Sequence, residues 1–133
     1  MLKDIKEAFR SHIQEITGKT VYDTGAYHDE NDFPFLKLRL HNLTARHARD
    51  LVMSNITYTL DIFTRYSGEQ EIIEIVDEII KSLPQFIENN NITYCYLNRL
   101  QILDDNETGP LRKHGVANFT FIITGGLADE DGE

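Results

Sequence analysis

Several residue types that would define a function class are scarce in this sequence. Its 133 residues include one cysteine and no tryptophan, so an internal disulfide is excluded. The lone Cys95 stands in an apolar stretch, which predicts a small buried side chain in a reducing compartment. Apolar runs never approach the ~20 residues of a membrane-spanning helix, and the charged opening segment lacks the apolar core of a secretion signal. We therefore expect a protein that is made and kept in solution.

Motifs for catalysis and cofactor binding are also missing. The chain contains no phosphate-binding glycine loop, no dinucleotide fingerprint and no nucleophile elbow. None of its five histidines stands four residues from another, the spacing of a helical zinc pair. The best cluster for a divalent cation, His28 with Asp29, Glu30 and Asp32, is explained more simply as an exposed polar loop. We predict no catalytic residue, no cofactor and no metal.

Basic side chains are outnumbered, because 13 Lys and Arg face 22 Asp and Glu, which gives a net charge of −9. Four of the acids stand in the last six residues, and the rest of the chain is acidic as well. Such a surface repels phosphate backbones and argues against a dedicated nucleic-acid binder. The length predicts one domain, residues 1–125, followed by an acidic disordered tail, residues 126–133.

Hydrophobic periodicity predicts two amphipathic helices. The first runs from Leu2 to Ile16, with Gly18 as its C-terminal stop. The second follows Ser67, a candidate N-cap, and we expect Pro84 and the asparagines at 89–91 to end it. Its predicted apolar stripe consists of Ile72, Ile73, Ile75, Val76, Ile79, Ile80 and Leu83.

Alternation with a period of two predicts strands at 20–22, 35–40, 55–66, 92–102 (interrupted at Asn98) and within 111–124. Leu36, Leu38 and Leu40 are expected to share a buried face, and so are Ile92, Tyr94, Tyr96, Leu100 and Ile102. Tyr58 is also predicted to pack in the core. The order α-β-β-β-α-β-β indicates an α+β fold, an antiparallel or mixed β-sheet with both helices packed on one face.

A local basic cluster lies between two of these strands. Alternation breaks from His41 to Ser54, which predicts a hairpin with a long connecting arm. The arm carries Arg46, His47 and Arg49, and Arg39 precedes it. We expect this arm to contact an acidic surface of a neighbouring copy or partner, and a solvated loop is the alternative. Tyr27 and Phe33 flank a second polar stretch, 23–32, and either form a protein contact or pack locally.

The order and spacing of these segments resemble the tail-completion (tail-terminator or tail-to-head joining) proteins of long-tailed, non-contractile bacteriophages. The resemblance covers about residues 1–125 and rests on five stretches: 20–23 leading into a loop, the Pro-containing strand at 33–38, the strand 56–66, the helix at 76–83 and the closing strand at 113–121. It includes no catalytic motif, so it assigns no chemical role to any residue.

The resemblance implies a ring, usually a hexamer, that ends tail-tube growth and meets the head-connector or stopper protein. Such a ring would assemble from copies of this chain and tail-tube protein in the host cytoplasm, then reside in the virion at the tail–head joint. DNA would pass through it without specific binding. The alternatives are a head-completion or neck protein, a tail-tube subunit, and a small monomeric cytosolic protein-binding module.

Overall fold

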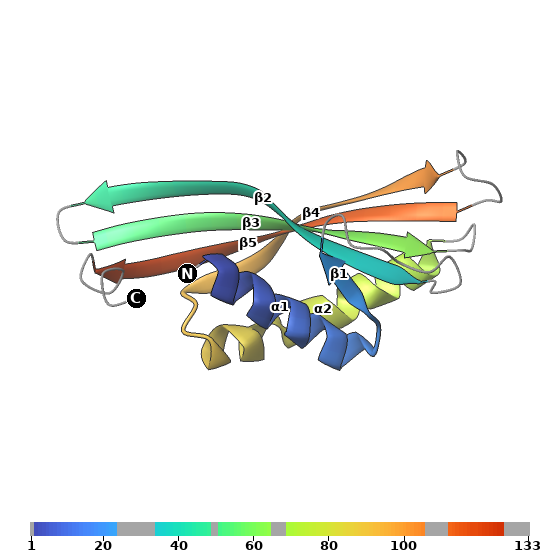
Figure 1. Ribbon diagram of the computed structural model, residues 1–133, viewed down its shortest axis with the longest axis horizontal. Helices are drawn as coiled ribbons and strands as arrows, with labels where there is room; N and C mark the ends of the chain where they lie inside the picture. Colours follow the sequence, from blue (N-terminus) through green and yellow to red (C-terminus); the bar gives the residue numbers. More distant parts are fainter. Residues whose placement is uncertain (1, 24–33, 49–50, 65–68, 106–111, 127–133) are drawn as a thin grey trace.

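The computed structural model describes residues 2–23, 34–48, 51–64, 69–105 and 112–126. Both helices lie on one face of a long, twisted five-stranded sheet (Figure 1). The order α-β-β-β-α-β-β is as predicted. The elements are α1 (Leu2–Thr17), β1 (Val21–Asp23), β2 (Phe35–Ala48), β3 (Leu51–Thr64), α2 (Gln70–Asn89), β4 (Tyr94–Asp105) and β5 (Arg112–Gly126).

The sheet is mixed, with the strand order β1-β2-β3-β5-β4. The short β1 pairs in parallel with β2, and all other neighbouring strands are antiparallel. Since β1 covers only Leu36 to Leu38, β2 has no strand partner on that side among the described residues from Arg39 onward. The prediction of an antiparallel or mixed sheet is therefore confirmed in its mixed form.

Helix α1 ends as the sequence predicted. Gly18 adopts a positive φ of 69°, a left-handed conformation that glycine adopts without a steric penalty, and its N–H bonds to the carbonyl of Gln14 at 2.9 Å. The ring of His12 on α1 donates from Nε2 to Ser82 Oγ on α2 at 2.8 Å, because the Ser82 hydroxyl hydrogen is already directed to the carbonyl of Ile79. This bond fixes α1 along one side of α2.

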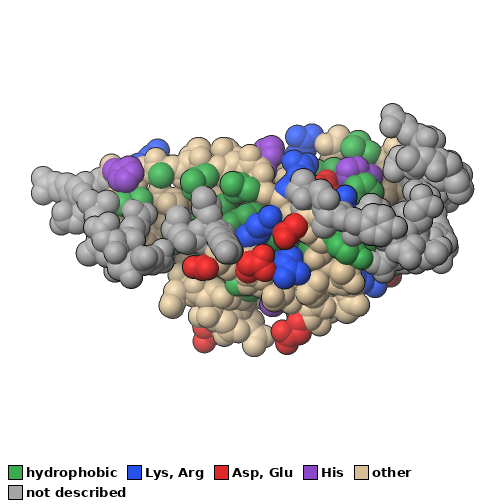
Figure 2. All heavy atoms as spheres, viewed as in Figure 1, with side chains coloured by type: hydrophobic (Ala, Val, Ile, Leu, Met, Phe, Trp, Pro, Cys, Tyr) green, Lys and Arg blue, Asp and Glu red, His purple; other side chains and the backbone are tan. Residues whose placement is uncertain are grey.

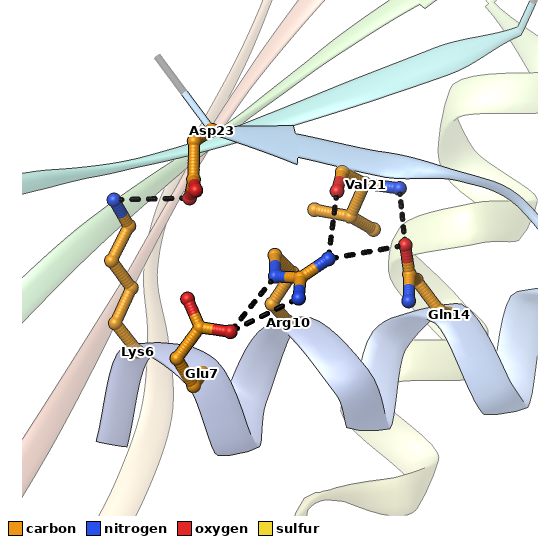
Figure 3. A network of polar contacts seen from close by, with 6 residues as sticks. All are labelled: Lys6, Glu7, Arg10, Gln14, Val21 and Asp23. Carbon is orange, nitrogen blue, oxygen red and sulfur yellow. Dashed lines mark hydrogen bonds and ion pairs between the residues drawn. The ribbon is translucent and has the colours of Figure 1, made fainter. Parts of the chain in front are cut away.

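A polar network holds the short strand β1 against α1 (Figure 3). Arg10 donates to the carbonyl of Val21 at 3.4 Å and forms an ion pair with Glu7 at 3.0 Å. Gln14 accepts the N–H of Val21 at 3.1 Å, and Lys6 forms an ion pair with Asp23 at 3.3 Å. These contacts satisfy backbone groups on the side of β1 away from β2, so we assign them a role in the fold.

Helix α2 begins at Gln70 after Glu69, which makes no side-chain capping bond, while the predicted cap Ser67 lies outside the described residues. The helix continues through Pro84, which is exposed, and ends at Asn89, so only the asparagine stop was predicted correctly. Passing Pro84 brings Phe86 into the core, where its ring meets that of Phe9 at 5.4 Å. This burial offsets the loss of one backbone hydrogen bond at the proline.

The core lies between the helices and the sheet. It is formed by the inward side chains of all seven elements except the ends of β2 and β3, with Phe9, Phe86, Phe119 and Phe121 at its centre. Tyr58 is buried there as expected. Cys95 is buried too, and burial raises its pKa to about 12, so the thiol is a packing residue.

Residues 41–48 and 51–54 are strand and not loop, which corrects the prediction of a connecting arm. Strands β2 and β3 pair continuously from Phe35↔Phe63 to Ala48↔Leu51, so the segment is the end of a long β-hairpin. A bulge between Leu40 and Asn42 explains the error. Because it inserts one residue, the side chains that follow change faces, and the alternation that marks a strand is interrupted in the sequence.

A bulge between Leu97 and Arg99 has the same effect in β4. The interruption at Asn98 was predicted, but its consequence for the register was not. Cys95 and Leu97 face the core before the bulge, and Tyr94 lies on the opposite side with 54% of its surface exposed. The prediction that Tyr94 and Tyr96 pack in the core is therefore wrong.

Candidate functional site

The end of the β2–β3 hairpin carries the basic residues that the sequence singled out. Arg46 and His47 lie on β2 and are exposed, while Arg39 lies nearer the middle of the strand. Of the other candidates, Arg49, Tyr27 and Phe33 lie outside the described residues, as does the cluster around His28. We define the hairpin surface as Thr44, Arg46, Leu51 and Met53, which the strand register places together on the sheet face away from the helices.

The hairpin surface is positively charged within an acidic protein. The described residues of β2, together with β3 from Leu51 to Leu60, include no aspartate or glutamate. Arg46 forms no ion pair with any other residue that the structure describes. A free guanidinium on an exposed strand suits contact with a carboxylate-rich surface.

Two large apolar side chains, Leu51 and Met53, are exposed on the same surface, with exposed fractions of 43% and 38%. Leu40 and Leu43 are 46% and 40% exposed on the opposite face, since they pair with Tyr58 and Ile56. The hairpin extends past the helices (Figure 1), and Figure 2 shows hydrophobic, basic and histidine side chains at this end of the sheet. Grouped apolar side chains of this size on a protein surface are typical of protein–protein contacts.

A hollow of about 270 Å³ opens on this part of the hairpin, lined by Thr44, Ala45, Arg46, Met53 and Asn55. The methionine supplies an adaptable apolar wall and the arginine a charged rim. Both come from adjacent strands, since Arg46 pairs directly with Met53. The hollow is small for a cofactor site and suits the side chain of a protein partner.

A buried carboxylate fixes the base of the hairpin on the sheet face away from the helices. Asp61 on β3 accepts hydrogen bonds from Arg39 Nε on β2 and from His114 Nε2 on β5, each at 2.9 Å. Burial alone would raise the pKa of Asp61, but the bonds from His114 and Arg39 outweigh it, and the pKa lies below its usual value. The carboxyl group is thus held ionised.

Aromatic stacking continues this cluster across the strands. The ring of His114 stacks on Phe63 at 4.3 Å, and Phe63 stacks on Phe35 at 4.8 Å. No hydroxyl or thiol group in the described parts of the chain bonds to His114, so a Ser–His–Asp arrangement is not formed there. The cluster positions Arg39 and links β2, β3 and β5. Sequence reasoning missed it because Asp61 and His114 stand far apart in the chain.

Neutral side chains make a similar ladder further along this face. Thr59 donates to Asn118 at 2.7 Å, Thr57 and Thr120 are 3.0 Å apart, and Asn98 donates to Thr120 at 3.2 Å. These cross-strand pairs satisfy polar groups and stiffen the sheet. Within the described ranges, no group of three or more His, Cys, Asp or Glu is placed to hold a metal ion. The described helices include none long and apolar enough to cross a membrane.

Comparison with known proteins finds one matching family. The sequence pattern of one family, described as "Tail completion protein gp17", matches residues 8–124. No curated protein matches the chain. The match covers α1 from Ala8, both hairpin strands, α2 and most of β5. The chain therefore belongs to the phage tail-completion protein family, and its role is a structural one in the phage tail.

Proposed function

We propose that this protein assembles with copies of itself into a ring that ends the tail tube and joins it to the head connector. The observation that carries the proposal is the hairpin surface, where cationic and apolar side chains extend beyond the helix layer. A surface of this composition suits burial against another protein subunit. The family supports the tail-related role, and the ring itself is our inference.

The charge of the chain suits a ring around DNA. A net charge of −9 repels phosphates over most of the surface, so DNA passes through a channel lined by such subunits without being held. The hairpin is the exception, and its positive charge is better placed at a contact between subunits than in the channel. We infer that the ring acts through its protein contacts and catalyses no reaction.

The test is the assembly state of the purified chain, alone and mixed with purified tail-tube protein. Sedimentation velocity and negative-stain electron microscopy should show closed rings in at least one of the two conditions. Arg46→Glu should reduce ring formation while leaving the thermal unfolding midpoint unchanged, because the side chain is exposed. The matched control Lys19→Glu makes the same charge change outside the hairpin and should assemble normally. A chain that stays monomeric at high concentration in both conditions refutes the ring.

A further inference from the structure

Helix α2 has a second exposed surface, on the side that faces away from α1. Ile73 and Ile80 are 41% and 40% exposed, although the sequence pattern predicted that both would pack on the sheet. At about 100° per residue, these two positions lie on one side of the helix, opposite Ser82. Ser82 bonds to His12 of α1, so α1 covers the other side. We define the α2 flank as Ile73, Glu74, Asp77 and Ile80.

The α2 flank carries the charge opposite to that of the hairpin surface. The helix contains Glu71, Glu74, Asp77, Glu78 and Glu88 against a single Lys81. Asp77 pairs with Lys81 at 2.9 Å, but both side chains are more than half exposed. Exposed pairs of this kind add little stability, so an incoming arginine can compete for the carboxylate.

The two surfaces lie on different parts of the sheet. Helix α2 covers one face of the sheet, where it packs on β4, β3 and β5, whereas the hairpin surface lies on the other face, on β2 and β3. Both surfaces are exposed in the single chain, so neither covers the other within one subunit. A contact between two different patches of like subunits is head-to-tail, and repetition of it closes a ring when the rotation permits.

We propose that the hairpin surface of each subunit docks on the α2 flank of the next copy. Arg46 meets the carboxylates of Glu74 and Asp77, and Leu51 and Met53, on the same face as Arg46, cover Ile73 and Ile80. The two patches carry opposite charges, and each has exposed apolar side chains, so their charge and apolar surface are complementary. It rests on the proposed ring and names the surface that the hairpin contacts.

Chemical cross-linking tests the pairing on the full chain. Thr44→Cys places a thiol on the hairpin surface rim and Ile80→Cys places one on the α2 flank, and both positions are exposed. The native Cys95 is buried with a raised pKa, so it reacts slowly. A short bis-maleimide reagent added to the assembled double variant should give a ladder of linked subunits on a denaturing gel.

The controls separate this contact from others. Each single-cysteine variant should give no ladder, and neither should Thr44→Cys combined with Glu15→Cys, which moves the second thiol to α1. Dimers from Thr44→Cys alone would mean that hairpins contact each other and would overturn the pairing. The pairing is also overturned if the wild-type chain assembles but the T44C/I80C variant gives no ladder, or is linked only to tail-tube protein. In that case the proposed ring still stands.

Charge reversal gives an independent measurement. Arg46→Glu and Asp77→Lys should each raise the concentration needed for half-assembly about tenfold, the effect of losing one well-placed contact. An equal mixture of the two variants should recover wild-type assembly, because a reversed hairpin then meets a reversed flank. R46E mixed with E15K should not recover. Failure of the first mixture to recover refutes the pairing, whereas a wild-type chain that never assembles refutes the proposed function as well.

Discussion

The two faces of the sheet are formed by the same strands but have different surroundings. On β3, Leu60 is fully buried beneath α1 and α2, while Leu51 on the same strand is 43% exposed. Both are leucines on paired strands, so strand propensity does not distinguish them. The difference is the face of the sheet: Leu60 lies on the helix side, where Val52 and Ile56 are buried as well, whereas Leu51 lies on the face away from the helices. An apolar side chain without a covering layer in its own subunit is available to another subunit.

The largest expected effect is on the free energy of unfolding, and it should distinguish the two leucines. Leu60→Ala should lower the free energy of unfolding by about 2–5 kcal/mol, because it leaves a cavity in a packed core. Leu51→Ala should change it by no more than about 0.5 kcal/mol, yet it should weaken ring assembly. Urea titration followed by circular dichroism measures the first effect, and sedimentation velocity measures the second. Equal loss of stability in both variants would mean that the face carrying Leu51 is covered within the monomer.

A second test concerns how tightly the covered part is packed. A Cβ added at Gly115 on β5 would lie 2.7 Å from Cγ2 of Ile72 on α2, closer than real contacts allow. Gly115→Ala should therefore cost about 1–3 kcal/mol of stability through overpacking. In the Ile72→Ala background the same change should cost clearly less, since the clashing methyl group is gone. Additive effects in this double-mutant cycle would show that the helix does not press on the strand here.

Most of the covered part was predictable from the sequence, for a physical reason. The stripes of α1 and α2 and the alternation of β3 and β5 follow from helices and strands packing one face on a core. Gly18 marked the end of α1 because a left-handed residue ends a helix. The exposed flank of α2 was not predictable, because Ile73 and Ile80 are as apolar as the buried residues beside them.

The hairpin was predicted, but its end was mistaken for a non-strand arm because the residue pattern does not record the local bulge. The bulge at His41 reverses the alternation, and Asn42, Thr44 and Arg46 then give one face a polar pattern that is typical of a loop. The location of the basic cluster was nevertheless predicted correctly. The Asp61 cluster depended on the strand register, since Arg39 and His114 reach one carboxylate only when β2, β3 and β5 are aligned.

The smallest expected effect lies at Asp61, on the sheet face away from the helices. Its lowered pKa means that the folded state favours the ionised carboxyl group. This contribution is complete above the unfolded value of about 3.9 and is lost as the pH falls through the lower folded value. Asp61→Asn should cost about 1 kcal/mol at neutral pH, because the amide retains one acceptor.

The two stability curves should converge as the pH falls below about 4, where the wild-type carboxyl group becomes protonated. The matched control Asp77→Asn removes an exposed carboxylate and should leave the curve of unfolding free energy against pH unchanged near neutrality. If Asp61→Asn also weakens ring assembly, Arg39 needs its carboxylate partner to hold the hairpin in position, and the buried cluster then controls the exposed surface. Normal assembly of this variant would show that the hairpin is positioned by its backbone pairing alone.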